Sequence, residues 1–538
     1  MAFERDYGYE EAGGAVTYMD GFYALLTSTG NDTGIAYVRP ELRQLMYDYR
    51  LIEDCIFGQR VIKLRRELYL PKPNAEDCTP QNNARYEAYL RRAVFYNVTK
   101  RTRDGLTGYV FSRDPEITVP ALMDNVVSDS DGAGIDLTQA AKRSLGHVLS
   151  FGRAGVLTDY PPAPDGSTVS DLATGQVRPT IVAYHPYQIR NWRTMVRGAK
   201  VVLSMVVLLE KHVWDDDGFQ ELIGVQFRVL RLDPVSGHYT VELWYANDPN
   251  STDFILQEQY SPSGGDGQPI TDLPFTFIGS ENNDSNPDLP PLLDMANLNI
   301  AHYRNSADYE ESCFICGQPT PVVTGLSEQW YEKVLNKQIN FGSRGGIPLP
   351  VGGTAMLIQA EPNSMIKEAM DHKERQMVAL GAKLIEDSTI ARTATEARMD
   401  DTSETSILAT CAKNVGTAYQ YALEWAAKFM GVAETEVTFE INTNFDLATM
   451  DALTRAQLLK EWQSGAISWT EYRENMRKSG LVSQDDDVAQ AEIEKAEETQ
   501  LGKEQDAAAV AAQNAPAVVA PGVQQGTSNL PAPATVVS

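Results

Sequence analysis

PPLLDMANLNIAHYRNSADYEESCFIC, residues 290–316, is the stretch from which most of the fold can be predicted. It contains neither Gly nor Pro after Pro291, and Gly317 and Pro319 come soon after its end. Because Gly and Pro are the residues that most often end helices, the stretch predicts one long helix that stops at Cys316. At a rise of ~1.5 Å per residue, this helix would be about 40 Å long.

Two further long helices are predicted after it. Residues 364–386 carry an apolar stripe, interrupted by Lys373, at Ile366, Met370, Met377, Leu380 and Leu384. A third helix is expected over residues 394–430, because Thr393 and Glu396 have the spacing of an N-terminal capping box. The later half of the third helix has apolar residues at alternating steps of three and four, which is typical of packing on another helix. These residues are Leu408, Cys411, Val415, Ala418, Ala422, Trp425 and Phe429. The first half, residues 397–406, is polar and is expected to be solvated or to line a wet space.

The region before these helices is predicted to begin with helices. Residues 41–112 are expected to be helical, and Tyr86, Leu90, Val94 and Val98 recur every fourth residue, which gives one apolar helix face. A further helix over residues 137–151 is expected to end at a glycine, because Gly is the usual residue just past a helix end.

Strands are predicted after that glycine. A strand is expected at residues 155–161, and between residues 198 and 260 apolar side chains alternate with polar ones. A turn at residues 233–237 divides the alternating region, which predicts a small antiparallel sheet. Gly-, Asn- and Pro-rich segments at residues 261–268 and 281–288 are expected to be surface loops. The fold class is therefore expected to be α+β.

The length of 538 residues predicts several domains, because one hydrophobic core does not grow so large. Residues 1–40 are expected to form an extended arm. Towards the other end, residues 446–463 and 468–479 predict a helical pair, whose second helix is capped by Ser468 and Glu471. No charged side chain follows Asp506, and the composition there has no periodic apolar face, so residues 501–538 are predicted to be a disordered tail.

The formal net charge of −27 limits the classes of function. A tight nucleic-acid binder gains affinity when Lys and Arg release counterions from phosphates, so tight, static DNA binding is not expected. No apolar stretch approaches the ~18 residues that a membrane helix needs, and the acidic N-terminal residues do not resemble a signal peptide. We therefore expect no membrane partner and a protein that stays in a cytoplasm or leaves it by lysis. The five cysteines are scattered and odd in number, which argues against a disulfide framework.

No catalytic residue, cofactor or metal is predicted. Cys313 and Cys316 have the spacing of half a zinc or redox site, but no second pair of ligands exists, so packing as small apolar side chains is favoured. The acidic runs at residues 129–132 and 215–218 lack the ligand spacing of calcium loops and are interpreted as turns. The glycine-rich run at residues 342–346 is not followed by the Lys and Ser or Thr of a phosphate-binding loop.

Two basic clusters could contact nucleic acid. One is Lys63 with Arg65 and Arg66, and the other is Arg91 and Arg92 with Lys100, Arg101 and Arg103. In so acidic a chain, a solvated helix face or ion pairs between subunits are favoured over nucleic-acid contacts.

The order of these elements resembles that of the portal proteins of tailed bacteriophages. The order is a mixed N-terminal domain, a long helix, a short β and loop excursion, a second long helix, a polar loop, a third long helix and C-terminal helices. The resemblance extends over residues 35–500 and is strongest in three strings. They are GRAGVLTDYP (152–161), LPPLLDMANLNIAHYRNSADYEESCFICGQPTPVVTG (289–325) and IEDSTIARTATEARMDDTSETSILATCAKNVGTAYQYALEWAAKFMG (385–431).

This resemblance implies a portal fold. The mixed α/β wing would be residues 41–288, with stem helices at 289–316 and 364–386 that flank a small clip at 317–363. A tunnel loop at 387–393, a long wing helix at 394–430 and a helical crown at 431–500 would follow.

It also implies a structural protein and not an enzyme. Such proteins form rings, commonly of twelve subunits, at one capsid vertex, and double-stranded DNA passes through the ring during packaging and ejection. The implied partners are further copies of the chain, DNA, the capsid protein, the packaging motor (terminase), and tail or adaptor proteins. The implied location is the virion, and the host cytoplasm during assembly.

The implied tunnel loop consists of small and nearly neutral residues. They are Asp387, Ser388, Thr389, Ile390, Ala391, Arg392 and Thr393. Every added Lys or Arg contact binds DNA more tightly, so such a lining suits DNA that has to slide. Two interpretations of Arg392 remain open: a weak phosphate contact, or an ion pair with Asp387 or Glu396.

Two alternative functions remain. The chain could be another head–tail connector or adaptor, although adaptors are usually shorter and lack three long helices around an excursion. It could instead be a DNA-processing hydrolase that uses the acidic clusters, which would require a divalent-metal site.

Overall fold

The computed structural model describes residues 33–160, 177–248, 251, 253–317, 320–335, 348–358, 364–384, 406–443, 452–464, 466–478 and 495. The chain divides into two compact units, Met1–Phe445 and Asp446–Ser538, and each is described by itself. Within the ranges given, no helix is both long and apolar enough to cross a membrane.

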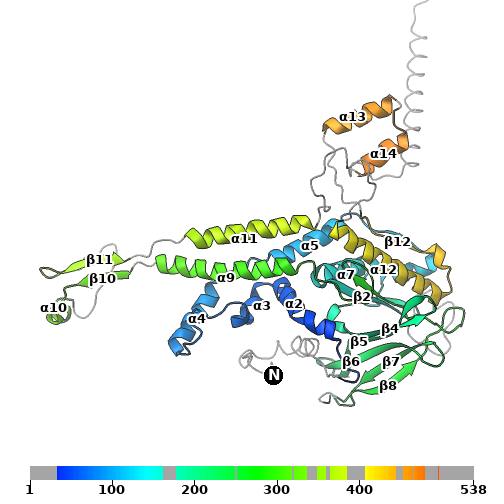
Figure 1. The fold of residues 1–538 in the computed structure, drawn as a ribbon, viewed down its shortest axis with the longest axis horizontal. Helices are drawn as coiled ribbons and strands as arrows, with labels where there is room; N and C mark the ends of the chain where they lie inside the picture. Colours follow the sequence, from blue (N-terminus) through cyan, green and yellow to red (C-terminus); the bar gives the residue numbers. More distant parts are fainter. Residues whose placement is uncertain are drawn as a thin grey trace, which may run out of the picture. The chain divides into compact units, whose positions relative to one another are not determined.

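A five-stranded antiparallel sheet confirms the alternation predicted for residues 198–260 (Figure 1). In spatial order its strands are β4 (Ile189–Arg197), β5 (Lys200–Asp216), β6 (Glu221–Leu232), β7 (Tyr239–Tyr245) and β8 (Ile255–Tyr260). Alternate residues of β6, Val225, Phe227 and Val229, are buried, as the period of two requires.

The turn between β6 and β7 forms where it was expected. The Asp233 carboxylate accepts the backbone N–H of Ser236 at 2.6 Å and that of Val235 at 3.0 Å. Gly237 completes the turn with a φ of 72°, a conformation that costs glycine little.

A three-stranded antiparallel sheet lies beside helix α7 (Leu137–Phe151), and its order is β3-β2-β9. Its strands are β2 (Arg153–Asp159), β3 (Thr180–Tyr184) and β9 (Phe275–Gly279). Helix α7 ends at Gly152, as predicted, and this residue has a φ of 67°. A Cβ atom at this position would lie 2.6 Å from the carbonyl oxygen of Asp288, so the close approach of the two segments also requires glycine.

The N-terminal helices are shorter than the sequence predicted. They are α2 (Pro40–Phe57), α3 (Gln59–Leu64), α4 (Pro80–Arg92) and α5 (Val98–Val110). The periodic face that was expected to continue from Tyr86 to Val98 is interrupted, because the chain leaves the helix at Ala93 and Val94 is exposed. At the break the backbone N–H of Val94 donates to the Ser306 hydroxyl, and the Asn299 side chain binds the backbone where α5 begins.

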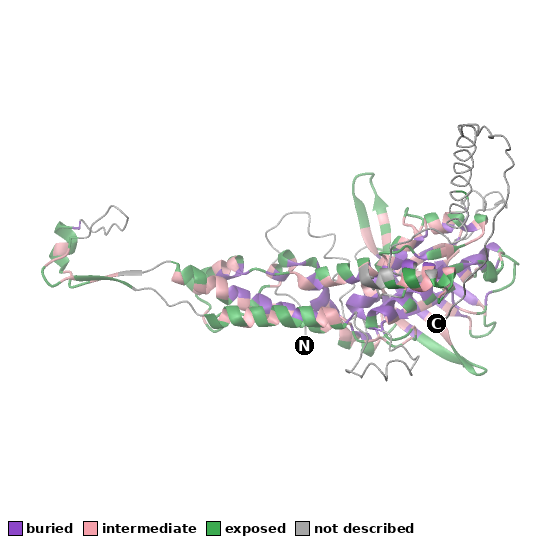
Figure 2. Ribbon diagram, turned by 90° about the horizontal axis from the view of Figure 1, so that it is seen from above, coloured by how far each residue is buried: buried purple, intermediate pink, exposed green. Residues whose placement is uncertain are grey.

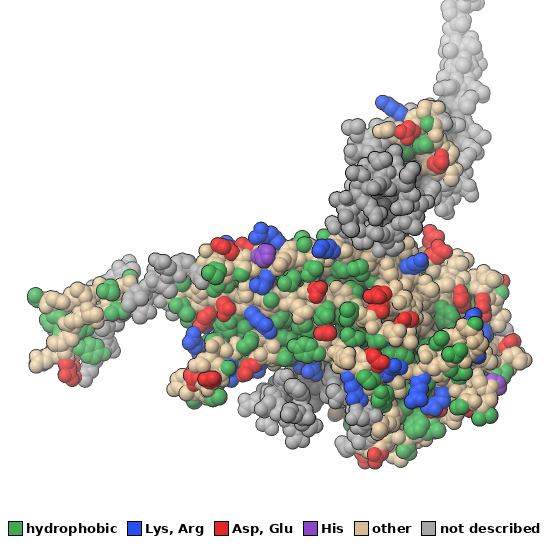
Figure 3. All heavy atoms as spheres, in the orientation of Figure 1, with side chains coloured by type: hydrophobic (Ala, Val, Ile, Leu, Met, Phe, Trp, Pro, Cys, Tyr) green, Lys and Arg blue, Asp and Glu red, His purple; other side chains and the backbone are tan. Residues whose placement is uncertain are grey.

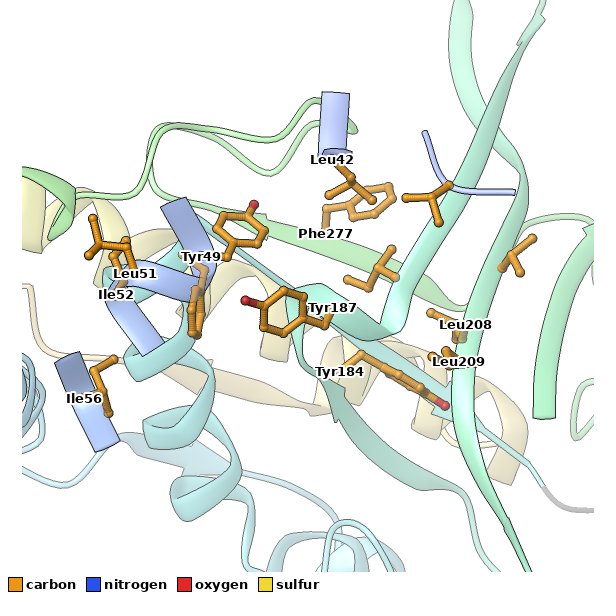
Figure 4. Packing of buried hydrophobic residues seen from close by; sticks show 14 of the residues in the cluster. Leu42, Tyr49, Leu51, Ile52, Ile56, Tyr184, Tyr187, Leu208, Leu209 and Phe277 are labelled. Carbon is orange, nitrogen blue, oxygen red and sulfur yellow. The ribbon is translucent and has the colours of Figure 1, made fainter. Parts of the chain in front are cut away.

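Helix α2 packs against the strands through one of two hydrophobic cores. Figure 4 shows Tyr49 and Ile52 of α2 on one side and Leu208 of β5 on the other, with Tyr187 between them. The Tyr49 ring contacts the Tyr187 ring edge to face, with 5.8 Å between the ring centres.

Helix α12 (Ile407–Met430) lies at the centre of the second core, with α7 and the three-stranded sheet against it (Figure 1). All the residues of its predicted seam are buried: Leu408, Cys411, Val415, Ala418, Ala422, Trp425 and Phe429. Polar contacts also fix the orientation of α12 against α7 and β2. The Thr158 hydroxyl donates to the Ala422 carbonyl at 3.0 Å, and the Ser144 hydroxyl lies 2.9 Å from that of Tyr419.

Residues 431–443, which we expected to belong to a helical C-terminal region, fold back onto the first unit. Strand β12 (Thr438–Glu440) pairs with β1 (Glu116–Thr118) in a two-stranded antiparallel sheet. The short elements of this unit that remain are η1 (Arg66–Leu68), η2 (Ala121–Met123), α6 (Asp124–Ser128), η3 (Pro186–Gln188) and η4 (Glu434–Glu436). The unit is therefore a mixed α+β fold with antiparallel sheets, as the alternation of helical and strand patterns predicted.

Two long helices extend the unit as a hairpin (Figure 1). They are α9 (Leu293–Cys316) and α11 (Ser364–Lys383). Between them the chain forms β10 (Thr320–Thr324), α10 (Glu328–Lys333) and β11 (Thr354–Ile358), in which β10 and β11 pair antiparallel.

The second unit contains α13 (Ala452–Gln463) and α14 (Trp469–Lys478). The predicted capping box begins α14, since the Glu471 N–H donates to Ser468 Oγ at 3.2 Å and the Ser468 N–H donates to Glu471 Oε2 at 2.8 Å. The predicted tail at 501–538 and the first 32 residues of the predicted arm lie outside the described residues.

Candidate assembly surface

Helix α9 is fixed to the N-terminal helices by the amide of Asn299. Its Oδ1 accepts the backbone N–H groups of Val98 and Thr99, each at 3.2 Å, and its Nδ2 donates to the carbonyl oxygen of Tyr96 at 2.7 Å. Asn299 is fully buried, so these bonds satisfy a side chain that water cannot reach. The amide therefore holds α9 at the junction before α5.

Ionic and polar contacts continue this attachment along α9. The Tyr89 hydroxyl donates to Asp308 at 2.6 Å, and Arg92 forms an ion pair with Glu311. The Ser306 hydroxyl accepts the backbone N–H of Val94 at 3.1 Å. The ion pair with Glu311 lies near the end of α9, where Arg92 also contacts the Phe314 ring.

Helix α11 packs on α9 through one face, most of whose residues are only half-buried. Met377 is its one buried residue, at 1% exposure, and Leu384 just after the helix is also buried. His302 of α9 adds a polar contact, with its Nε2 3.2 Å from Glu374 Oε1. Elsewhere on α11, Val378 is 72% exposed. A helix of this length with one buried residue leaves most of its surface open to a neighbour.

The excursion between α9 and α11 is mostly exposed. Figure 2 draws the β10–β11 end in the exposed and intermediate colours. Its exposed large apolar side chains are Tyr331, Val334, Val351, Met356 and Leu357. In Figure 3 hydrophobic side chains also lie at the surface over the two-helix segment, between acidic and basic ones. Exposed apolar side chains concentrated in one segment indicate a contact surface.

The expectation that Cys313 and Cys316 pack inside the fold is not met in the single chain. Cys313 is exposed and Cys316 is half-buried, at the end of α9 where Phe314 and Ile315 are exposed as well. The Arg92 guanidinium carbon lies 4.2 Å from the centre of the Phe314 ring. The apolar residues at the end of α9 therefore mark an exposed helix end and not a site in the core of the single chain.

The basic clusters are engaged in contacts within the chain. Arg65 pairs with Asp54 at 2.9 Å, Arg66 with Glu87, and Lys100 with Asp104 at 3.2 Å. The observed pairs lie within one subunit, so the expected preference for a solvated face or ion pairs between subunits over nucleic-acid contacts stays a prediction.

The acidic runs are turns, as predicted. Asp129 pairs with Arg178, and its Oδ1 accepts the backbone N–H of Gly134 at 2.8 Å. The Asp217 carboxylate accepts the backbone N–H of Gln220 and that of Phe219, and these bonds lower its pKa. Across the described residues, no group of three or more His, Cys, Asp or Glu side chains is placed to hold a metal ion.

The residues of the predicted tunnel loop lie outside the described residues, but both ends of the segment that contains them are described. The backbone N–H of Leu408 donates to the carbonyl oxygen of Leu384 at 3.1 Å, so the described residues before and after this segment lie side by side. Helix α12 begins at Ile407, where extended Ser406 is the N-cap and its hydroxyl accepts the Ala409 N–H at 3.2 Å. One unbroken helix over residues 394–430 is therefore not what the chain forms.

A hollow near the start of α12 had no counterpart among the sequence predictions. Its volume is about 540 Å³, and it lies between the first turns of α9 and α12. Its lining residues are Ser280, Glu281, Leu289, Pro290, Pro291, Leu293, Asp294, Ile407 and Thr410. The lining combines apolar surface with two carboxylates, which does not favour a phosphate ligand.

Comparison with known proteins gives a family model and remote structural likenesses. The family described as "Domain of unknown function (DUF4055)" matches residues 291–430, the part from α9 to α12. No curated protein matches.

Three solved structures are similar at low identity. One is described as "Virion of native gene transfer agent (GTA) particle", with 14% identity, a TM-score of 0.38, and coverage of 74% of this chain and 94% of the other. The second, "Neck of empty GTA particle computed with C6 symmetry", has 14% identity, a TM-score of 0.38, and coverage of 74% and 93%. The third, "Neck of native GTA particle computed with C12 symmetry", has 13% identity, a TM-score of 0.38, and coverage of 72% and 90%. Likenesses at this level do not show a shared function.

Proposed function

We propose that this chain is a structural subunit of a ring at a phage-like capsid vertex. The ring encloses a channel through which double-stranded DNA is packaged and later ejected. It also provides the surface on which the packaging motor, the capsid protein and the tail or adaptor proteins dock.

The observation that carries this proposal is the hairpin of α9 and α11. Its helices have 24 and 20 residues, yet α11 buries only Met377 within the chain. Isolated helices obtain most of their stability from tertiary packing, so the open faces of α11 need a neighbouring surface. Repeating the same contact around a closed ring supplies that surface to every copy.

The order of elements and the charge also support a channel. The long helices flank a small β excursion, as the stem and clip of portal proteins do, and the net charge is −27. An acidic protein holds phosphates weakly, which DNA in transit requires. In this proposal the ring has twelve copies, and Asp387, Arg392 and their neighbours line the narrowest part.

Electron microscopy of the purified full chain tests the ring. We expect closed rings with a central hole, and a mass by light scattering that is a multiple of 59.4 kDa. A monodisperse monomer at micromolar concentration would contradict the proposal. A compact dimer without a hole would instead favour a different vertex component.

The channel role has a separate test in assembled particles. Arg392→Asp is expected to leave the rings intact and to lower the genome content of particles, because a phosphate contact is replaced by repulsion. Arg392→Lys keeps the charge and serves as the matched control. Unchanged genome content in Arg392→Asp particles would assign Arg392 to an ion pair within the protein.

A further inference from the structure

The five-stranded sheet has two exposed hairpin ends that differ in charge. Strand β5 begins at Lys200 in the hairpin with β4 and ends at Asp216 in the hairpin with β6. We call residues 193–201 the basic tip and residues 213–222 the acidic tip.

The basic tip combines cations with exposed valines. Arg193, Arg197 and Lys200 are exposed there, while Val196 and Val201 face each other across the two strands at 73% and 69% exposure. Arg197 is paired with Asp272 of the same chain. Within the described residues, neither Arg193 nor Lys200 forms an ion pair, so both charges remain available.

The acidic tip combines carboxylates with an exposed aromatic ring. Phe219 is completely exposed at the end of the hairpin, next to Asp215, Asp216 and Asp217. Glu221 is paired with Lys211, but in the part of the chain that the structure describes no ion pair involves any of the three aspartates. A fully exposed Phe beside unpaired charges is typical of a contact residue, because exposing its ring to water is unfavourable.

These two tips cannot meet in one chain. They lie at opposite ends of the 17-residue strand β5, so at ~3.3 Å per residue they are about 50 Å apart. Their charges are opposite, and both have exposed apolar side chains. The surface that complements each tip is therefore present on every other copy of the chain.

We propose that the acidic tip of each subunit docks on the basic tip of the next subunit. This inference rests on the proposed ring, because a head-to-tail contact between two different surfaces is the kind that closes into rings. Asp215 and Asp216 face Arg193 and Lys200 of the neighbour, and the Phe219 ring covers its Val196 and Val201. The contact is small, so it adds to the helix contacts around the ring and sets the direction in which copies join.

Charge reversal at each tip tests the docking. In one variant Asp215→Lys and Asp216→Lys make both tips basic. Asp217 is kept because its carboxylate accepts two backbone N–H groups of the turn, whereas Asp216 accepts only that of Gly218. In a second variant Arg193→Glu and Lys200→Glu make both tips acidic. Each variant alone is expected to lose at least about tenfold in association constant per contact, because like charges then meet.

A mixture of the two variants separates this contact from other effects. The basic-tipped and acidic-tipped chains complement each other, so an equimolar mixture is expected to recover assembly in alternating order, and a chain with all four changes is expected to assemble alone. Asp253→Lys with Glu258→Lys reverses two exposed acids elsewhere on the sheet and should assemble as the unchanged protein does.

The outcomes distinguish this inference from the proposed function. Rings of normal stability in either single-tip variant, or no recovery in the mixture, would overturn the tip contact and leave the ring proposal standing. A failure of the unchanged chain to form rings would contradict the ring itself.

The apolar part of the contact has its own matched pair of variants. Phe219→Ser is expected to reduce the association constant by about tenfold, since a buried aromatic ring is lost from the interface. Val235→Ser removes an equally exposed apolar side chain from the β6–β7 turn and should change nothing. Equal effects of the two variants would overturn the assignment.

Discussion

Helices α12 and α11 have similar lengths, 24 and 20 residues, but differ in how their surfaces are used. Fifteen residues of α12 are buried in the first unit, whereas Met377 is the single buried residue of α11. Both helices carry an apolar stripe in the sequence. The stripe of α12 is satisfied inside the chain, and the stripe of α11 only in part. An apolar stripe thus predicts a packed face, but it does not tell whether the packing partner belongs to the same chain.

The largest expected effect follows from placing a charge in the α12 seam. Val415 is fully buried, so Val415→Asp puts an ionisable group in the core without a partner. The free energy of unfolding should fall by about 4 kcal/mol or more, enough to unfold many domains. Urea denaturation followed by circular dichroism measures it. A loss below about 1 kcal/mol would mean that α12 is not the centre of the core.

The next effect concerns the docking of α11 on α9. Met377→Ala removes the one buried side chain of α11 and should cost about 2–3 kcal/mol. Hydrogen exchange of the α11 amides should rise more than that of α12, because the change loosens the hairpin first. Met370→Ala, at a half-buried position of the same helix, is the control and should cost less.

A smaller loss of folding stability is expected when the pH is lowered. Burial lowers the pKa of His147 to about 4 and that of the neighbouring His185 well below its usual value. The two rings lie 4.6 Å apart, and Nδ1 of His185 accepts the Tyr187 N–H at 3.3 Å, a bond that only an unprotonated nitrogen can make. Between about pH 6.5 and 4 the unfolded chain therefore binds protons that the folded chain does not, so stability falls as the pH falls.

The expected loss from these histidines is about 1–2 kcal/mol over that pH range, since both residues keep some contact with solvent. Urea denaturation at a series of pH values should show it. In a chain with His147→Gln and His185→Asn the slope should flatten, while the stability at pH 8 changes less. An unchanged slope would place the acid sensitivity elsewhere.

The smallest effect on folding is expected from a substitution at Val378, which tests the difference between α11 and α12 most directly. Val378→Asp makes the same change as Val415→Asp, but at a 72% exposed position, so the free energy of unfolding should change by no more than about 0.5 kcal/mol. Ring assembly should nevertheless weaken, as light scattering at several concentrations would show. Intact rings would mean that this face of α11 stays in solvent.

Much of the fold could be predicted because its signals are local. The end of α7 at Gly152, the turn at Asp233 and the cap at Ser468 each depend on residues within one turn of the chain. These turns and helix ends form in the same way wherever the segment lies in the fold, because their hydrogen bonds form within the segment. The candidate assembly surface was predictable only as a pair of long helices, and the two sheet tips were not predicted at all. The two tips could not be predicted because their opposite charges are brought to the two ends of β5 only by the pairing of the strands.

By itself, then, the sequence determined the long helices, the alternating strands and the seam of α12, all of which follow from the periods of helix and strand. The tertiary structure alone decided three features. It interrupted the helical face at Val94, where Ser306 and Asn299 bind the backbone, and it paired β1 with β12. It also buried Arg153, whose guanidinium carbon lies 4.0 Å from the Trp192 ring centre and 4.1 Å from that of Phe277. Each feature joins residues more than about thirty positions apart, and no local pattern records a partner at that distance.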